Sequence, residues 1–343
     1  MNFTLSDDQQ QIRDAVLKLA SRFGDDYWLA RDSDGVFPEE FCRALADDGW
    51  IGIAVPEAYG GSGLGVTEAA LVVQAISESG AGNSGVSAVA VGFFGLNPLI
   101  EFGTDEQRRE WLPRIIRRED IACFGVTEPS TGHDTTRLKT RAERDGDNYI
   151  IHGEKVWIST AQVANKIMLI ARTTPIEQCA KPSDGLSLFY ADLDRRYVDI
   201  RVIDKMGRKC VDSNEVFFDG LPVSRDQLIG EEGKGFRYLL HGLNAERVLI
   251  AAGLVGLGRA ALARAVNYAR EREVFGRPIG MNQAIQHPLA ANWAALEAAN
   301  LMAFKAADLY DRGLPCGAEA NAAKYLAAEA AFETCTNAVM THG

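Results

Sequence analysis

The sequence lacks several features that would assign it to a specialised class of protein. No apolar run reaches the roughly 18–20 residues of a membrane span, and the amino terminus, MNFTLSDDQQ, has neither the basic nor the apolar region of a secretory leader. The six cysteines show no CxxC spacing, which disfavours a metal site or a disulfide framework. These absences predict a cytoplasmic protein with reduced thiols, no membrane span and no bound metal.

The chain also has fewer basic residues than acidic ones. The chain has 36 lysines and arginines against 47 aspartates and glutamates, which gives a formal net charge of −11. A general nucleic-acid binder presents a basic face to the phosphates, so we expect no nucleic-acid partner. A local basic patch could still hold one anionic ligand, because the ligand need not match the net charge.

What is present is an ordinary globular composition, with 47% apolar residues in a chain of 343. Two capping boxes, at Ser6 and at Thr104, precede apolar residues at helical spacing. From about residue 121, short β-branched and aromatic runs alternate around turn residues, and Ala-rich helical sequence follows. The pattern predicts an α+β fold with an N-terminal helical domain (1–120), a middle antiparallel β-barrel-like domain (121–230) and a C-terminal four-helix bundle (231–343), incomplete at its carboxyl end.

The stretch GLGRAA, residues 256–261, matches a dinucleotide-binding fingerprint in its letters. That fold needs a second parallel strand after the crossover helix, whereas Ala-rich helical sequence follows Phe275. Glycines in a tightly packed helix are the better interpretation.

Two other stretches suit a ring cofactor. IACFGVTEPSTGHD, residues 121–134, runs from an apolar strand into a loop whose hydroxyl and backbone N–H groups could bind a polar heterocycle or a phosphate. WIS, residues 157–159, ends a strand with an aromatic side chain beside a hydroxyl, which suits stacking and hydrogen bonding to a ring. Taken singly, such a loop is most often only a turn, and a tryptophan most often belongs to the core.

The loop TEPSTGHD, the strand end KVWIS, the segment REVFGRPIGMNQ (272–283) and the order of helical, β and helical regions together resemble the acyl-CoA dehydrogenases. These flavoproteins oxidise the α,β bond of a fatty acyl thioester, and the resemblance covers essentially the whole chain. It implies one FAD per chain, an acyl-CoA substrate, a role in β-oxidation, and an electron-transferring flavoprotein as electron acceptor. It also implies a homo-oligomer, usually a dimer of dimers, that is, a homotetramer.

The resemblance assigns cofactor contacts residue by residue. Thr127 would bond the pyrimidine edge of the flavin, Trp157 would cover one ring face, and Ser159 would lie near N5. In the family, the segment 272–283 reaches the cofactor bound mainly by the neighbouring subunit. The remaining cofactor contacts implied in this way are Phe124, Val126, Gly132, His133, Ile158, Arg272, Phe275, Gln283 and Gly343.

Two positions depart from the family pattern. His133 stands where the family usually has a serine that touches both the thioester and the flavin phosphate, although a histidine can still donate a hydrogen bond. Met340 stands where the family favours a glutamine shortly before a His-Gly-Gly-like turn, so a cofactor contact there would be lost or altered. Family members continue past that turn, in many branches with the catalytic glutamate, so we expect further chain after Gly343.

Glu246 is the predicted catalytic base. The chemistry needs a group that removes the α proton while flavin N5 takes hydride from the β carbon, and a carboxylate serves if burial raises its pKa. LNAERVLIA (243–251) matches the pattern LxxERLVLA of the branch that resembles isovaleryl- and long-chain dehydrogenases, in which the base lies on this helix. The resemblance further implies that Asn244, Arg247 and His133 contact the substrate.

Other interpretations stay open at this point. Glu246 and Arg247 could belong to a salt-bridged network at a domain or subunit interface, since a buried carboxylate is usually paired. The same fold also serves flavin monooxygenases, which need no base, and acyl-CoA oxidases. A low-activity FAD-binding relative with a binding role would need a basic groove, which the acidic composition disfavours.

Overall fold

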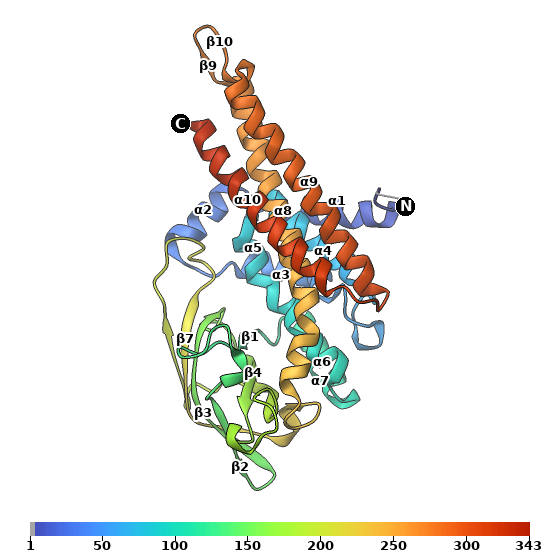
Figure 1. Cartoon of the computed structure of the whole chain (residues 1–343), viewed down its shortest axis with the longest axis vertical. Helices are drawn as coiled ribbons and strands as arrows, with labels where there is room; N and C mark the ends of the chain where they lie inside the picture. The colour runs from blue at the N-terminus through green and yellow to red at the C-terminus, as the bar shows by residue number, and fades with distance from the viewer. Residues whose placement is uncertain (1–3) are drawn as a thin grey trace. The chain divides into compact units, whose positions relative to one another are not determined.

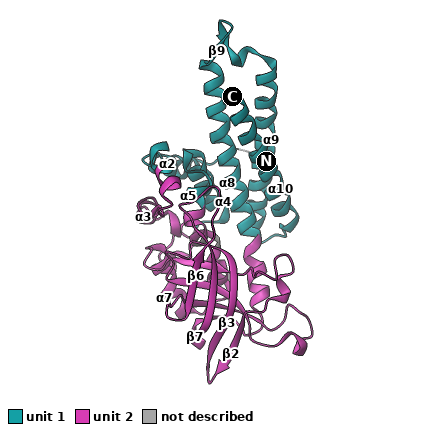
Figure 2. Ribbon diagram, turned by 90° about the vertical axis from the view of Figure 1, so that its left-hand side faces the viewer, with its two compact units in different colours: residues 1–29, 64–86, 244–343 teal, residues 30–63, 87–243 magenta. Residues whose placement is uncertain are grey.

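The computed structural model describes residues 4–343, which divide into two compact units, each assembled from separate stretches of the chain (Figure 1 and Figure 2). Unit 1, teal in Figure 2, comprises the residues up to 29, 64–86 and 244–343. Unit 2, magenta, comprises 30–63 and 87–243. The helical, sheet and helical regions follow one another along the chain as the sequence predicted, and the boundaries at residues 120 and 230 stay a prediction.

The sheet of unit 2 has eight strands, seven of them in the order β6-β7-β3-β2-β4-β5-β8, with β1 beside β4. Most neighbours are antiparallel, as predicted, and β1 and β2 each pair with β4 in parallel. The strands are β1 (Ala122–Gly125), β2 (Arg141–Asp145), β3 (Asn148–Ser159), β4 (Lys166–Arg172), β5 (Leu186–Asp192), β6 (Val198–Val202), β7 (Ser213–Val223) and β8 (Leu228–Ile229).

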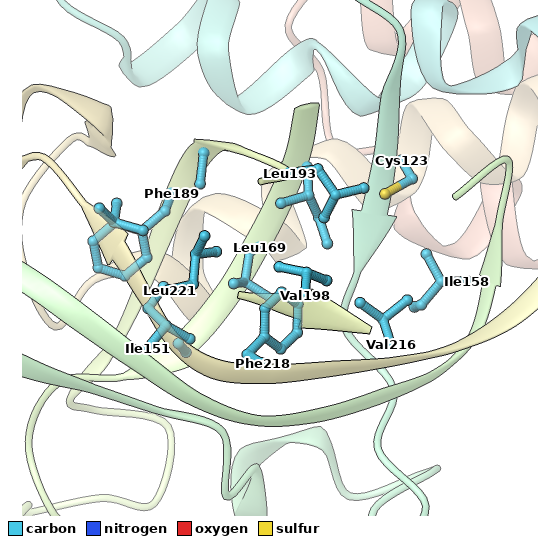
Figure 3. Packing of buried hydrophobic residues seen from close by; sticks show 14 of the residues in the cluster. Cys123, Ile151, Ile158, Leu169, Phe189, Leu193, Val198, Val216, Phe218 and Leu221 are labelled. Carbon is cyan, nitrogen blue, oxygen red and sulfur yellow. The ribbon is translucent and has the colours of Figure 1, made fainter. Parts of the chain in front are cut away.

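Two apolar clusters lie on opposite faces of β4 and β5. Figure 3 shows the strands curving around the first cluster, which includes Leu169 and Phe189. The alternate residues Met168 and Tyr190 belong to the second cluster, together with Trp111. Because successive side chains of a strand point to opposite faces, burial on both faces explains why β4 and β5 carry continuous apolar runs at residues 167–171 and 188–191.

The helices of unit 2 cover the second cluster. Side chains of α6 and α7, including Leu99, Trp111 and Ile115, pack against the sheet residues of that cluster. Helix α7 starts at the predicted capping box, in which Gln107 N donates to Thr104 Oγ1 at 3.2 Å and Thr104 N donates to Gln107 Oε1 at 2.9 Å. The α-helices wholly in unit 2 are α3 (Glu39–Asp47), α6 (Asn97–Phe102) and α7 (Asp105–Ile116).

Unit 1 is a helical bundle that combines both ends of the chain. The long helices α8, α9 and α10 lie side by side (Figure 1) and meet through alanines such as Ala251, Ala303 and Ala327, whose small side chains allow close approach. Helix α4 also packs on α9, so the fourth helix of the bundle comes from the N-terminal half. The α-helices of unit 1 are α1 (Asp7–Ala20), α4 (Val66–Ile76), α8 (Gly235–Glu271, whose first residues belong to unit 2), α9 (Gln283–Asp311) and α10 (Gly317–His342). Helices α2 (Asp25–Asp34) and α5 (Gly82–Ala90) each have residues in both units.

The start of α4 is capped by a residue far away in sequence. Asp311, the last residue of α9, accepts hydrogen bonds from Val66 N at 2.7 Å and from Thr67 N at 2.9 Å. A carboxylate at a helix N-terminus satisfies unpaired N–H groups and complements the helix dipole. One side chain thus joins the N-terminal and C-terminal helices of unit 1.

Helix α8 is also, within the described part of the chain, the one helix long and apolar enough to cross a membrane by length and composition. Core helices of soluble proteins meet the same criterion, and 56% of its most apolar window is buried inside the protein. We therefore interpret α8 as a core helix of the bundle.

Candidate active site

The loop after β1 begins where β1 packs closely on β4. The pairing is parallel and sets Phe124 opposite Met168 and Gly125 opposite Leu169. A Cβ on Gly125 would lie 2.8 Å from Ile167 Cδ1, which is too close for a side chain, so the glycine allows this approach. The predicted cofactor residues that follow, Val126 and Thr127, are half-buried and leave part of their surface accessible.

The buried side chain of Glu128 connects this loop to later residues through hydrogen bonds. Its buried carboxylate accepts hydrogen bonds from Lys139 N at 2.7 Å, from Thr140 N at 2.9 Å and from Lys155 Nζ at 2.9 Å. Lys155 Nζ also donates to the carbonyl of Val126 at 3.0 Å. The carboxylate therefore ties residue 128 to residues 139 and 140, and the ammonium group ties the loop to β3.

The charges of this pair influence each other. Burial raises the pKa of Glu128, but the Lys155 charge and the hydrogen bonds from Lys139 and Thr140 outweigh burial and hold it below 4.5. Burial lowers the pKa of Lys155 from 10.5 to about 8, against the opposing attraction of Glu128.

The strand end with Trp157 lies against the same loop. Val156 N donates to the carbonyl of Thr127 at 2.9 Å, so the predicted ring-covering and pyrimidine-bonding residues are on adjacent segments. The pairing of β3 with β7 shifts register between Lys155 and Ile158, and Trp157 adopts φ +64° at this irregularity. Bulges of this kind re-aim a side chain, and here the indole is 63% exposed.

The neighbours of Trp157 point elsewhere. The side chain of Ile158 lies in the first apolar cluster of the sheet with 2% exposure (Figure 3). A contact between Ile158 and a cofactor would therefore run through its backbone. Ser159 is half-buried and pairs with Ser213 of β7.

The stretch from Pro129 to Arg137, which carries Gly132 and His133, is mostly exposed. It is held from beneath by Arg172, whose Nη2 donates to Thr136 O at 2.7 Å and whose Nε donates to Leu138 O at 3.2 Å. The same guanidinium donates to the carbonyls of Thr174, Pro182 and Asp184.

Glu246 is a half-buried residue of α8. Burial raises its pKa above 4.5, and the positive charge of Arg247 opposes the shift without cancelling it. Arg247 Nη1 donates to Asn244 Oδ1 at 3.1 Å. Within the described residues 4–343 of this single chain, no ion pair joins either Glu246 or Arg247 to another group.

The remaining predicted residues lie at the ends of the long helices of unit 1. Arg272 and Phe275 belong to the hairpin of β9 (Glu273–Val274) and β10 (Arg277–Pro278), where the Phe275 ring is fully exposed. Gln283 begins α9. Gly343 follows α10, and Met340 in the last turn is exposed.

Three charged residues around the loop were not predicted from the sequence: Glu128, Lys155 and Arg172. For Lys155 a signal was present, because it occupies an inward position in the alternation Tyr149, Ile151, Gly153 of β3. A lysine at such a position is almost never fully buried unless it is paired.

Three descriptions of one family match the chain in order. The N-terminal, middle and C-terminal domains of acyl-CoA dehydrogenase match residues 6–119, 123–221 and 233–343. The chain belongs to the acyl-CoA dehydrogenase family. A probable acyl-CoA dehydrogenase of Bacillus subtilis, YngJ, is 35% identical over 347 residues, covering 100% of this chain and 90% of that protein.

Solved structures agree with this assignment. Butyryl-CoA dehydrogenase from Megasphaera elsdenii superposes with a TM-score of 0.91 at 30% identity and covers 100% of this chain and 90% of that one. The prolyl acyl carrier protein oxidase AnaB superposes with a TM-score of 0.93 at 28% identity, covering 99% and 89%.

Enzymes of the acyl-CoA dehydrogenase fold are FAD-dependent oxidoreductases, so this chain is a flavoenzyme. The residues after β1 and at the end of β3 fit such a cofactor. An indole that a bulge holds out from the sheet suits stacking on an isoalloxazine ring, and the hydroxyl of Thr127 on the adjacent segment suits a polar ring edge.

Proposed function

We propose that this acyl-CoA dehydrogenase family member converts an acyl-CoA thioester to the trans-2-enoyl-CoA, with Glu246 as the base that removes the α proton. Bound FAD supplies the hydride acceptor. The observation that carries the proposal is that Glu246 is half-buried on α8 while its neighbour Arg247 bonds Asn244, so that burial raises the pKa of Glu246 despite the adjacent positive charge. A carboxylate poised in this way accepts a proton more readily than a free one near neutral pH.

The bonding of Arg247 supports separate roles for the neighbouring charges. Its guanidinium is bonded to the amide of Asn244 and not to Glu246, which leaves the carboxylate available. We assign Asn244 and Arg247, together with His133 of the exposed loop, to contacts with the CoA thioester. This assignment belongs to the branch with the base on the first helix of the C-terminal bundle, as in isovaleryl- and long-chain-type enzymes.

For the cofactor, we assign Thr127 to the pyrimidine edge, Trp157 to a ring face and Ser159 to the region of N5. Phe124, Val126, Gly132 and the backbone of Ile158 complete this group within one chain. Arg272, Phe275 and Gln283 lie at helix ends of unit 1, and we assign them to the cofactor of a neighbouring subunit. Gly343, after α10, is a further cofactor contact in this proposal. The exposed Phe275 ring supports this, because an apolar side chain at a hairpin tip suits an interface.

The proposal also covers the assembly, the pathway and the electron acceptor of the enzyme. The enzyme would act as a homotetramer in β-oxidation in the cytoplasm and pass electrons to an electron-transferring flavoprotein. An oxidase is the second candidate, since AnaB shares the fold along almost the whole chain. Rapid reoxidation of the reduced flavin by oxygen would favour that alternative.

The test is anaerobic flavin bleaching with a panel of acyl-CoAs, comparing the wild type with Glu246→Gln. We expect the variant to bind FAD normally and to reduce it about 10²–10⁴-fold more slowly, the range for loss of a general base. Glu271→Gln, which neutralises an exposed glutamate at the end of the same helix, is the matched control. Bleaching of Glu246→Gln at the wild-type rate would assign the base to another residue.

A further inference from the structure

Lys155 has a charged side chain at a fully buried position, where a charge costs free energy. Its exposure is 0%, and it lies on β3 among inward-facing residues that otherwise build the core. An apolar side chain there would avoid the cost of removing an ammonium group from water. The partners of the ammonium group indicate what the charge is used for.

The ammonium group bonds two consecutive features of the loop after β1. It donates to the carbonyl of Val126 at 3.0 Å and to the carboxylate of Glu128 at 2.9 Å. Thr127 lies between these two anchors, and its own carbonyl accepts from Val156 N, the residue after Lys155. Residues 126–128 are therefore fixed to residues 155 and 156 by three bonds.

The same residues precede the bulge that exposes Trp157. The register of β3 against β7 shifts directly after Lys155, and Trp157 takes a left-handed backbone conformation that a non-glycine residue adopts only at a cost. Surrounding contacts must hold such a residue in place. The bonds from residues 155 and 156 to the loop are the contacts of this kind directly before Trp157, and the bond from Asn214 Nδ2 to the carbonyl of Ile158 at 2.8 Å follows it.

We infer that Lys155 and Glu128 are positioning residues of the flavin site. They hold Thr127 and Trp157 in register, so that the Thr127 side chain can contact the ring edge and the Trp157 side chain the ring face. The inference rests on the proposed roles of Thr127 and Trp157. It assigns no catalytic step to either charged residue, since both are buried beneath the loop.

The test uses the oxidised holoenzyme of Lys155→Met, Glu128→Gln and the double variant. We expect FAD to bind at least tenfold more weakly to Lys155→Met and to the double variant, with a changed visible circular dichroism of the bound flavin. The double variant removes both charges, so its thermal midpoint should recover toward wild type. Its flavin signals should stay altered, because the anchor on Val126 is lost.

Lys209→Met, at an exposed lysine of the same unit, is the matched control and should keep wild-type flavin signals. Wild-type FAD affinity and dichroism in the double variant would overturn the inference. So would failure of the double variant to fold, which would make the pair a requirement of the sheet itself. Both readouts precede substrate binding, so they do not depend on whether Glu246 is the base.

Discussion

At the scale of single residues, Glu246 predicts how the rate depends on pH. Its pKa is raised above 4.5 by burial, so flavin reduction should increase with pH as the carboxylate ionises, with an apparent pKa above 4.5. The raised pKa also contributes stability that is present below pH 4.5 and lost as pH rises through the folded-state pKa. Stopped-flow reduction and thermal unfolding between pH 4 and 9 measure both effects. Glu246→Gln should leave only the slowed reduction, about 10²–10⁴-fold below wild type, without this pH dependence, and should remove this part of the stability profile.

Glu128 predicts the opposite dependence of stability on pH. Its pKa is lowered, chiefly because the Lys155 charge and the N–H groups of Lys139 and Thr140 outweigh burial. The carboxylate therefore contributes stability that is present above pH 4.5 and lost as pH falls through the lower, folded-state pKa. In Glu128→Gln, the thermal midpoint should fall less steeply as the pH is lowered. An unchanged acid slope in this variant would show that the pair does not govern acid unfolding.

Arg172 supports the exposed loop that carries His133, so its substitution should weaken acyl-CoA binding. Its guanidinium bonds five carbonyl oxygens, two of them at Thr136 and Leu138 beside the His133 loop. A lysine has three donors and cannot reproduce this geometry. We expect Arg172→Lys to raise KM for acyl-CoA about tenfold, since 1.4 kcal/mol, near the worth of one charged hydrogen bond, is a factor of ten. Arg196→Lys, at an exposed arginine that pairs with Asp194, should leave KM unchanged.

The sequence alone indicated the site residues that local motifs carry, but not the ones that hold them. Thr127 and Trp157 follow from two short stretches, and the structure brings them onto adjacent segments. Glu128 bonds a lysine 27 positions away, and Asp311 caps a helix more than 240 positions away. Such partners depend on strand register and helix packing, which alternation and capping patterns do not specify.

At the scale of elements, capping signals were predicted correctly because their partners are three residues apart. Gln107 does more than the capping box requires, since its Nε2 also donates to the carbonyls of Asp226 and Leu228 at 2.7 and 2.8 Å. The alternation of β2 and β3 predicted strands, whereas the parallel partner of β1 and β2 was not predicted. A strand pattern identifies a buried face but not the neighbouring strand.

This arrangement predicts different losses of stability for two substitutions at the start of α7. Thr104→Ala removes the N-cap acceptor and should cost about 1 kcal/mol. Gln107→Ala removes three hydrogen bonds, each worth about 0.5–1.5 kcal/mol net, and should cost more. Urea unfolding measures both, with Gln10→Ala at an exposed glutamine as control. Equal costs for the two α7 variants would mean that the bonds from Gln107 to Asp226 and Leu228 contribute little.

At the scale of the whole molecule, the sequence predicted three consecutive domains, and the compact units group the chain differently. Helices α1 and α4 share a unit with the C-terminal helices, and the Asp311 cap on α4 is part of that grouping. The chain passes between the units four times, at residues 29, 63, 86 and 243. Local patterns assign each segment its element but carry no information on which distant segments pack together.

The sheet region therefore offers a direct test of the proposed domain 121–230. One apolar cluster lies within residues 123–228, so the isolated fragment can bury it. The second cluster loses Leu99, Trp111 and the other residues of α6 and α7, which exposes Met168 and Tyr190. Burying a large apolar side chain stabilises by about 1.5–3 kcal/mol, so fragment 121–230 should melt well below fragment 87–243 and bind a hydrophobic dye. Cooperative unfolding of the shorter fragment at the same temperature, without dye binding, would establish residues 121–230 as an independent folding domain.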